Sequence, residues 1–392
     1  MISFEQALSK LLFLAKKIDI ELVKIEEACG RVLREETIST RDQPPFDASS
    51  MDGYALKKLD KLPGKKLLVV GKVAAGASFD GSVLEGQAVR IFTGAPMPTG
   101  TNSVLIQEDA VEVENVITIQ DKVEENDFVR KKGCDYKAGK TLLQKGVILK
   151  SFDIALLASM NFPLLTVTRR PIVSIISTGD ELIFPGNSPK PNQIVASNTY
   201  GLKALINKWG AIGHILPIAR DNKTSLEKAL DLAVPADLVI TIGGASVGDH
   251  DYVNEVFNTI NVKHSFYKVA MRPGKPILAG KNKNTIFMGL PGNPVSALVC
   301  AHLFLKPLIG KMLGTVELNN IEKKAYLAND LAENAGRKHF MRAFLKNDSL
   351  EIPSDQDSSL LSVLQKSNAL AIRQPNEKAA KKGDQISYLE LD

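Results

Sequence analysis

The stretch "DLVITIGGASVGDHDYVNEVFNTI", residues 237–260, decides the fold class, because it is typical of a strand, a glycine-rich loop and a helix in succession. The first residues are almost continuously apolar, which indicates a strand buried on both faces of a parallel sheet. Gly243 and Gly244 would let backbone N–H groups close on an anion, since neither carries a Cβ. Asp251 follows a few residues later and would repel that anion. The loop thus combines an anion-binding feature with an opposing carboxylate.

The alternation of strand and helix extends on both sides of this loop. The strands expected are "PIVSIIS", "HILPIA" and "TIFMGL", and the helices expected are "SNTYGLKALINKWG", "TSLEKALDLA" and "PVSALVCAHLFLKPLI". Strand and helix in turn predict a parallel sheet that is covered on both faces. We therefore predict a three-layer α/β domain with a mostly parallel sheet over residues 169–315.

The rest of the chain lacks this alternation. Residues 42–138 carry short apolar runs broken by glycine and proline ("KKLLVV", "QAVRIF", "NSVLI", "NVITI"), which predicts a β-rich inserted domain. The segments "SFEQALSKLLFLAKKI" and "SFDIALLASM" have helical spacing and are expected to pack beside each other. Residues 1–41 and 139–168 would then form a helical spacer domain. The short pieces in residues 316–392 predict a small C-terminal β domain.

Composition excludes several classes of protein. A chain of 392 residues with 44% hydrophobic and 24% charged residues is typical of a soluble protein of two to four domains. No apolar run reaches the roughly 20 residues that span a bilayer, and the N-terminus is too acidic for a signal peptide. We therefore expect a cytoplasmic protein that does not bind a membrane. Cys29, Cys134 and Cys300 are too far apart for a disulfide framework or a zinc site. A net charge of +5 with interleaved signs favours a small anionic ligand over a nucleic acid.

Acidic residues follow three strands of the predicted sheet. Glu181, Asp221 and Asp251 should converge, because ligands of open α/β sheets bind beyond the carboxyl ends of the strands. Each acid alone would suit a solvated loop, but carboxylates gathered beside a glycine loop suit a hard cation such as Mg²⁺ that is shared with a phosphate. The cation would neutralise the repulsion between the acids and the phosphate. Other residues expected at this edge are Thr178, Gly179, Asp180, Gly243, Gly244, Ser246 and Gly248.

A basic segment and a helix start come next along the chain. "KVAMRPGKP" sets Lys268, Arg272 and Lys275 around a proline–glycine bend. In "GLPGNPVSA", Asn293 suits a helix N-cap and Pro294 the first helical turn. An ordinary capped helix explains this pattern equally well. The exposed N–H groups of a helix start beside three cations nevertheless predict an anion site.

Two further segments, "DQPPFDASSMDGYA" and "RIFTGAPMPTG", have no strand or helix period. Together with "STGDEL", "GGASVGDHDY", "RPGKP" and "GLPGNPVSA", in this order, they resemble the molybdopterin molybdenumtransferase family. The resemblance spans nearly the whole chain and weakens after about residue 320. Members of this family insert molybdenum in the last step of molybdenum cofactor synthesis, and the C-terminal part of gephyrin is a relative.

The resemblance implies a fold, substrates and partners. It implies a homodimer of four-domain subunits that acts on adenylylated molybdopterin and molybdate and releases AMP. It also implies a divalent cation that promotes cleavage of the adenylate, and we expect this cation to be Mg²⁺. Other proteins of molybdenum cofactor synthesis are expected as partners. Cleavage of a phosphoanhydride depends mainly on positioning and charge neutralisation, which agrees with the predicted acidic edge.

The resemblance also implies site residues. Asp52, Thr93 and Asp135 match family site positions in the β-rich domain. The implied metal ligands are Glu181, Asp221 and Asp251. The implied catalytic residues are the same three acids and Asp52. The residues that match the anion-binding side are Lys268, Arg272, Lys275, Pro291, Pro294 and Ser296. Asn293, the predicted N-cap, is expected to bind substrate beside them.

The chain departs from the family pattern at two places. Arg272 stands where relatives often carry lysine, and a planar guanidinium does not replace a point charge neutrally. Near the C-terminus, "QDSSLL" stands where relatives show a Gly-Ser pair. We assign Ser358 to that position, with Arg337 or Arg342 supplying charge.

Two other functions compete with insertion of molybdenum. Adenylyl transfer from ATP to molybdopterin, the preceding step, uses a similar α/β domain, but the β-rich insertion and the C-terminal β domain favour insertion. A non-catalytic, gephyrin-like scaffold predicts loss of the acidic edge, whereas Glu181, Asp221 and Asp251 are all present. No function is assigned to any of the five histidines; His250, between two acids, suits a solvated loop.

Overall fold

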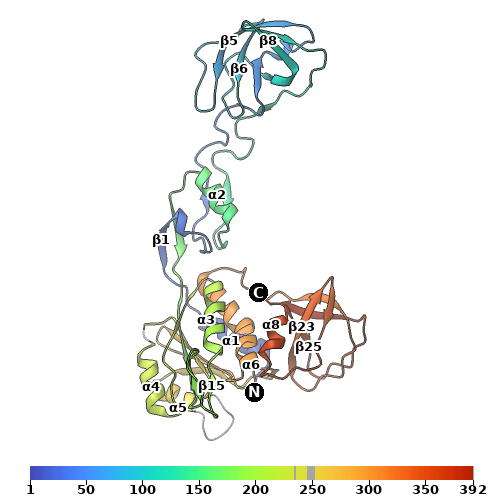
Figure 1. Ribbon diagram of the computed structural model, residues 1–392. Helices are drawn as coiled ribbons and strands as arrows, with labels where there is room; N and C mark the ends of the chain where they lie inside the picture. Colours follow the sequence, from blue (N-terminus) through green and yellow to red (C-terminus); the bar gives the residue numbers. More distant parts are fainter. Residues whose placement is uncertain (234, 245–251, 392) are drawn as a thin grey trace. The chain divides into compact units, whose positions relative to one another are not determined.

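The computed structural model describes residues 1–233, 235–244 and 252–391 (Figure 1). The chain folds into two compact units. One unit contains Met1–Glu35, Lys145–Ile154 and Pro163–Asp392, and the other contains Glu36–Gln144 and Ala155–Phe162. The α/β region and the C-terminal region therefore belong to the same unit.

The centre of the first unit is a six-stranded sheet of order β16-β13-β17-β21-β20-β18. Strands β13, β16, β17 and β21 run parallel, β20 is antiparallel to β21, and β18 is antiparallel to β20. The prediction of a mostly parallel sheet is thus confirmed. The strands are β13 (Ile172–Ser177), β16 (Ile212–Ile215), β17 (Leu238–Ile242), β18 (Lys263–Tyr267), β20 (Leu278–Asn282) and β21 (Thr285–Leu290).

Both faces of this sheet are covered by helices, because its strands are apolar on both sides. On β17, Ile240 and Ile242 belong to one core and Val239 to the other. The first core contains side chains of α3 (Asn198–Lys208), α6 (Pro294–Cys300) and α7 (Lys306–Leu313). The second contains side chains of α4 (Lys223–Asp231) and α5 (Tyr252–Thr259). The result is the predicted three-layer α/β arrangement.

A π-helical turn, Ala301–Leu305, joins α6 and α7 into one helical stretch. By length and composition, Pro294–Leu313 could cross a membrane, and it is the only such helix in the described part of the chain. The helix predicted from "PVSALVCAHLFLKPLI" thus forms, although no apolar segment of membrane-spanning length was expected. Since 83% of its 18-residue apolar window is buried inside the protein, it is a core helix of this unit.

Helix α1 (Phe4–Leu14) packs on the α/β core. Ser3 caps it by accepting a hydrogen bond from the Gln6 N–H, and Phe4, Ala7 and Leu11 are buried on one face. Phe4 meets Phe304 edge to face at 5.2 Å between ring centroids. The prediction that α1 packs beside the second helix, α2 (Ser151–Ser159), is wrong, because the apolar face of α1 is part of the larger α/β core.

The C-terminal region is a small closed barrel. Strand β23 pairs with β24 and β25, and β22 and β26 complete the ring. Closure leaves no free sheet edge. Strand β19, from the α/β region, adds in parallel to the start of β23. The elements are β19 (Met271–Arg272), β22 (Lys323–Leu327), β23 (Lys338–Lys346), β24 (Ser349–Glu351), α8 (Leu361–Lys366), β25 (Ala369–Arg373) and β26 (Gln385–Glu390).

The second unit is built around another six-stranded sheet, of order β7-β4-β6-β5-β9-β8. The four strands expected from the apolar runs all form. The sheet contains β4 (Gly53–Leu56), β5 (Lys66–Val73), β6 (Gln87–Ile91), β7 (Ser103–Ile106), β8 (Ala110–Val113) and β9 (Val116–Ile119). Short ladders join β2 (Thr37–Ile38) to β11 (Thr141–Leu143) and β3 (Ala48–Ser49) to β10 (Val129–Arg130). In the first unit, β1 (Ile20–Lys24) pairs with β12 (Leu164–Thr168).

Candidate functional site

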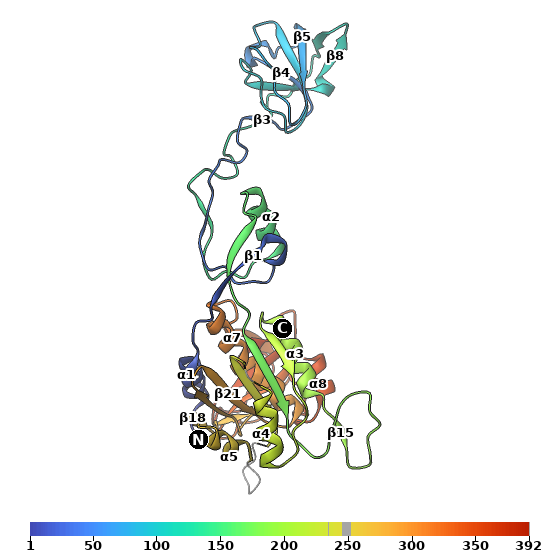
Figure 2. The same ribbon diagram turned by 90° about the vertical axis from the view of Figure 1, so that its left-hand side faces the viewer.

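The carboxyl ends of the parallel strands lie beside a cavity of about 620 Å³. Its lining comes from the ends of several strands because parallel strands end at one edge of the sheet. The volume lies within the range of small-molecule sites. Residues 182–195 form a loop that includes the ladder of β14 (Leu182–Ile183) and β15 (Ile194–Val195) (Figure 2). Leu182, Ile194 and Val195 of this loop line the cavity. The predicted residues in the lining are Thr178, Glu181, Asp221, Gly243, Gly244, Asn293 and Pro294.

The structure brings two of the three predicted metal ligands to this cavity. Glu181 and Asp221 both line it. Asp180 instead supports the neighbouring turn: its carbonyl accepts a hydrogen bond from Arg220 at 3.0 Å, and its carboxylate accepts the Asp221 N–H at 3.3 Å. In residues 1–233, 235–244 and 252–391 no group of three or more His, Cys, Asp or Glu side chains could hold a metal ion. The predicted residues Ser246, Gly248 and Asp251, and also His250, lie outside the described part of the chain.

The glycines at this edge allow close packing of the strand ends. Gly243 has φ +86°, and a Cβ there would lie 2.8 Å from the Thr178 carbonyl oxygen. Its N–H donates to the Leu290 carbonyl at 3.1 Å, so this N–H is not free to bind a phosphate as the sequence had suggested. Gly179 leaves room for a carboxylate, since a Cβ there would approach Glu181 Oε2 to 2.6 Å.

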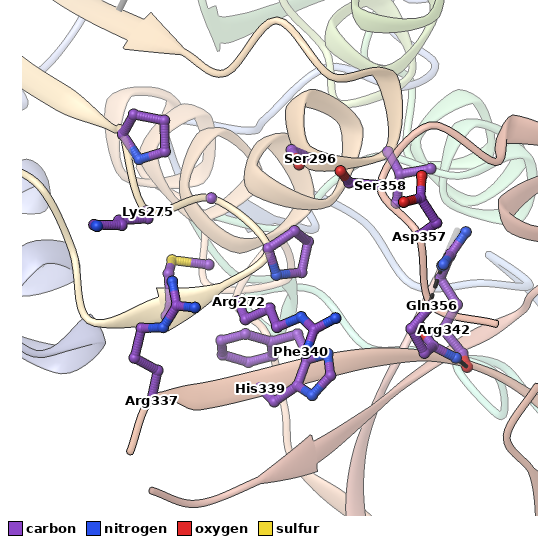
Figure 3. Close-up of a pocket in the computed structure, with 15 residues that line it drawn as sticks. Arg272, Lys275, Ser296, Arg337, His339, Phe340, Arg342, Gln356, Asp357 and Ser358 are labelled. Atoms are coloured by element: carbon purple, nitrogen blue, oxygen red, sulfur yellow. Dashed lines mark hydrogen bonds between the residues drawn. The ribbon is translucent and has the colours of Figure 1, made fainter. Parts of the chain in front are cut away.

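A second, basic cavity of about 230 Å³ lies where the barrel meets α6 and β19 (Figure 3). Figure 3 shows Ser296 and Ser358 on the side of α6, and Arg272, His339 and Arg337 on the side of β23. The predicted residues in its lining are Arg272, Lys275, Ser296, Arg342 and Ser358, together with the alternative Arg337.

The cations of this cavity have different surroundings. Arg342 is 2% exposed. Its guanidinium donates to the backbone carbonyls of Leu360 at 3.0 Å and Asp355 at 3.3 Å, so it fixes the loop that follows β24. In contrast, the side chains of Arg272, Lys275 and Arg337 make no hydrogen bond or ion pair within the described residues. Of the two arginines left open by the sequence, Arg337 has the guanidinium available for an anion.

The start of α6 separates the two cavities. Asn293 and Pro294 occupy the N-cap and first-turn positions, as predicted. The Asn293 side chain does not cap the helix but donates to Ser358 Oγ at 2.8 Å. The Val295 N–H donates to the Ser358 carbonyl at 3.1 Å, so one N–H expected to bind an anion is already bonded. Asn293 lines the larger cavity and Ser358 the smaller, and their hydrogen bond joins the two walls.

Two residues predicted for the anion-binding side, Lys268 and Pro291, line neither cavity. Lys268 has φ +62°, and its ammonium lies 4.6 Å from the centre of the Tyr267 ring. Pro291 is buried in the turn between β21 and α6. Both therefore shape segments that lead to the cavities.

In the second unit, the structure pairs two of the predicted residues. Asp52 Oδ1 accepts hydrogen bonds from the Thr93 N–H at 2.8 Å and from its hydroxyl at 2.9 Å. These two bonds hold the pKa of Asp52 below its usual value. Asp135 is exposed on another turn, where its N–H donates to the Gln43 carbonyl at 3.0 Å.

His339, which was not predicted as a site residue, lines the basic cavity. Burial, followed by the charges of Arg272, Arg337, Arg373 and Arg342, lowers the pKa of His339 to about 4. The β pieces predicted in residues 316–392 gave no signal for it, because its place opposite Arg272 and Arg373 depends on the pairing of β23 with β19 and β25.

A ligand cavity at the carboxyl edge of a three-layer α/β domain, next to a basic cavity under a small β-barrel, defines a multidomain protein that binds small anionic molecules. Comparison with known families narrows this class. Residues 2–161 match the MoeA N-terminal region (domains I and II), residues 174–311 a probable molybdopterin binding domain, and residues 324–391 the MoeA C-terminal region (domain IV).

Individual proteins are similar to this chain over three quarters of its length or more. A molybdopterin molybdenumtransferase of Haemophilus influenzae is 35% identical over 396 residues, covering 99% of this chain and 98% of the relative. One from Nostoc is 40% identical over 305 residues, covering 76% and 70% of the two chains. The solved MoeA protein of Pyrococcus horikoshii is 30% identical, with a TM-score of 0.84 over 100% of this chain and 99% of that one. The chain belongs to the MoeA family of molybdopterin molybdenumtransferases.

Proposed function

We propose that this protein is a molybdopterin molybdenumtransferase, which inserts molybdenum from molybdate into adenylylated molybdopterin and releases AMP. The observation that carries the proposal is a pair of adjoining cavities of different size and charge at the start of α6. The larger cavity has the volume for an extended organic substrate, and the smaller one has the charge for a compact anion.

The basic cavity suits a tetrahedral dianion. Arg272, Lys275 and Arg337 supply positive charge, and their side chains form no ion pair within the described residues. Charge-assisted hydrogen bonds from such cations to oxyanions are stronger than hydrogen bonds between neutral groups. Ser296 and Ser358 add hydroxyl donors. The two substrates would meet at the hydrogen bond between Asn293 and Ser358, where the cavities adjoin.

The acidic residues of the larger cavity suit Mg²⁺. Glu181 and Asp221 offer carboxylate oxygens, the ligand type that this cation takes, and Asp251 is the proposed third ligand. The bound cation would neutralise the phosphates of the adenylate beside these acids. The chain's own part is to hold the adenylate: the glycine turn brings backbone close to it, and the residues between β13 and α3 wall the cavity.

Membership of the family supports three further proposals: a homodimer, a cytoplasmic location without nucleic acid or membrane contacts, and handover of the product to other proteins of molybdenum cofactor synthesis. Light scattering tests the first. A homodimer has twice the chain mass of 42.6 kDa, and a single-chain mass at working concentrations would contradict it.

The activity is tested by AMP release from adenylylated molybdopterin with Mg²⁺, with and without molybdate. We expect release that depends on molybdate, is lost in Asp221→Asn and Asp251→Ala, and is kept in Asp231→Asn, which alters an exposed acid at the end of α4. Binding of the adenylate without cleavage would instead favour a scaffold. Pyrophosphate release from ATP and molybdopterin would identify an adenylyltransferase.

A further inference from the structure

His339 stands in the middle of a cross-strand row of cations. It lies directly opposite Arg272 of β19 on one side and opposite Arg373 of β25 on the other. Side chains at directly opposite positions share a face of the sheet, with Cβ atoms about 5 Å apart. The row is therefore Arg–His–Arg, and like charges placed in this way repel each other.

The imidazole also connects two hollows in the protein. It is 8% exposed and lines both the basic cavity and a neighbouring one of about 270 Å³. Arg272 and Arg337 line both as well. No hydrogen bond or ion pair of the His339 ring occurs among the described residues, so its nitrogens are available to a ligand.

The acids near His339 do not neutralise the cations of the row fully. Glu377 pairs with Arg373 through Nε at 3.1 Å. Asp357 lines the basic cavity, but its carboxylate accepts the Ser359 hydroxyl at 2.6 Å and the Ser359 N–H at 2.8 Å. Glu333 is exposed in the lining of the neighbouring cavity. Other charged side chains of the basic cavity and of β23 are Lys275, Arg342, Lys346 and Lys338, which pairs with Glu5. The Asp355 carboxylate acts on Arg342.

Among the residues that line the basic cavity, only His339 can change charge near neutral pH. Arginine and lysine are already protonated there. The hydrogen bonds from Ser359 hold the pKa of Asp357 below its usual range, so that carboxylate is already ionised. Burial and the surrounding arginines lower the pKa of His339 to about 4 and so favour the neutral imidazole, whereas a dianion in the cavity would offset the arginine charges and favour the imidazolium.

We propose that His339 is an oxyanion-binding residue that takes up one proton from solvent when molybdate enters the basic cavity and donates it as an N–H hydrogen bond to the anion. This rests on the function proposed above. The step is balanced: the imidazole gains a proton as the dianion arrives and returns it to solvent as the anion leaves. Molybdate would thus bind as a dianion together with one proton.

The coupling predicts a pH dependence whose sign is fixed. With a pKa of about 4 in the empty cavity, roughly 1% of His339 carries a proton at about pH 6. A higher pKa in the complex means that binding takes up a proton between the two pKa values. Affinity for molybdate should therefore rise as the pH falls through this window, by up to about tenfold per pH unit.

Isothermal titration calorimetry with molybdate tests the proposal on the full chain at about pH 6. Titrations in buffers of different ionisation enthalpy give the number of protons taken up, and phosphate and sulfate buffers are avoided because they would compete. We expect wild type to take up close to one proton per molybdate, His339→Gln none, and the control His214→Gln, an exposed histidine of β16, the wild-type number.

A second measurement needs no variant. The ring resonances of His339 in isotopically labelled wild type should titrate at higher pH with molybdate than without it. Molybdate binding without proton uptake, or uptake that persists in a folded His339→Gln protein, would overturn the inference and leave the proposed function standing. Absence of molybdate binding would overturn both, whereas proton-linked binding without AMP release would sustain the inference alone.

Discussion

Gly274 provides a stringent test of how the basic cavity is built. It lies in the cavity wall with φ +104°, and a Cβ there would overlap the Sγ of Cys300 on α6. Gly274→Ala should cost about 1–3 kcal/mol for the backbone conformation and about 1–3 kcal/mol for overpacking. The total loss in the free energy of unfolding should be about 2–6 kcal/mol.

The second substitution separates these two costs. Burial raises the pKa of the Cys300 thiol, so the group is neutral. Cys300→Ala therefore removes side-chain volume but no charge, and should lower the free energy of unfolding by about 1 kcal/mol. In the double variant Gly274→Ala/Cys300→Ala, the overpacking should be relieved and the backbone cost should remain. A favourable coupling of about 1–3 kcal/mol is expected.

Urea unfolding followed by the fluorescence of Trp209 measures these differences. Trp209 is the only tryptophan and lies in the same core as Cys300. Gly383→Ala is the matched control, because Gly383 has φ +91° with open space around it and should show only the backbone cost, without rescue by Cys300→Ala. If Gly274→Ala is as stable as wild type, or Cys300→Ala rescues none of the loss, the packing of the cavity wall against α6 is wrong.

Arg337→Gln should leave the free energy of unfolding, measured in urea, within about 0.5 kcal/mol of wild type. It should weaken molybdate binding at least about tenfold, since a charge about 6 Å from a dianion contributes about 1.4 kcal/mol even in water. Arg342→Gln should destabilise the protein by about 1–3 kcal/mol, because it frees the loop held at the Leu360 carbonyl; the reverse pattern in calorimetry and unfolding would contradict these roles. Thr93→Val should raise the pKa of Asp52 toward its usual value by removing the hydroxyl donor while keeping the N–H; an unchanged carboxyl titration by NMR would exclude this contribution.

The sequence predicts most of the fold because its signals are local. Continuous apolar runs followed by helical periods indicate a parallel sheet, and the order of the chain places Thr178, Glu181 and Gly243 at strand ends. The partner of α1 is not predictable in this way. Its apolar stripe says that one face is buried, but not which core receives it.

The basic cavity depends on contacts that local patterns do not encode. Whether Arg337 or Arg342 is free depends on the loop after β24, which captures Arg342. The Val295 N–H is taken by the same distant loop. His339 becomes notable only through the register of β19, β23 and β25, and register between strands far apart in the chain cannot be read from composition or period.

Anomalous diffraction at the molybdenum absorption edge, from crystals soaked in molybdate, tests the central claim most directly. That claim is that the basic cavity beside the larger one holds the metal oxyanion. The account predicts a molybdenum peak enclosed by Arg272, Arg337, Ser296 and Ser358. A fully soaked crystal without a molybdenum peak in this cavity, whether or not molybdenum binds elsewhere, would contradict the claim.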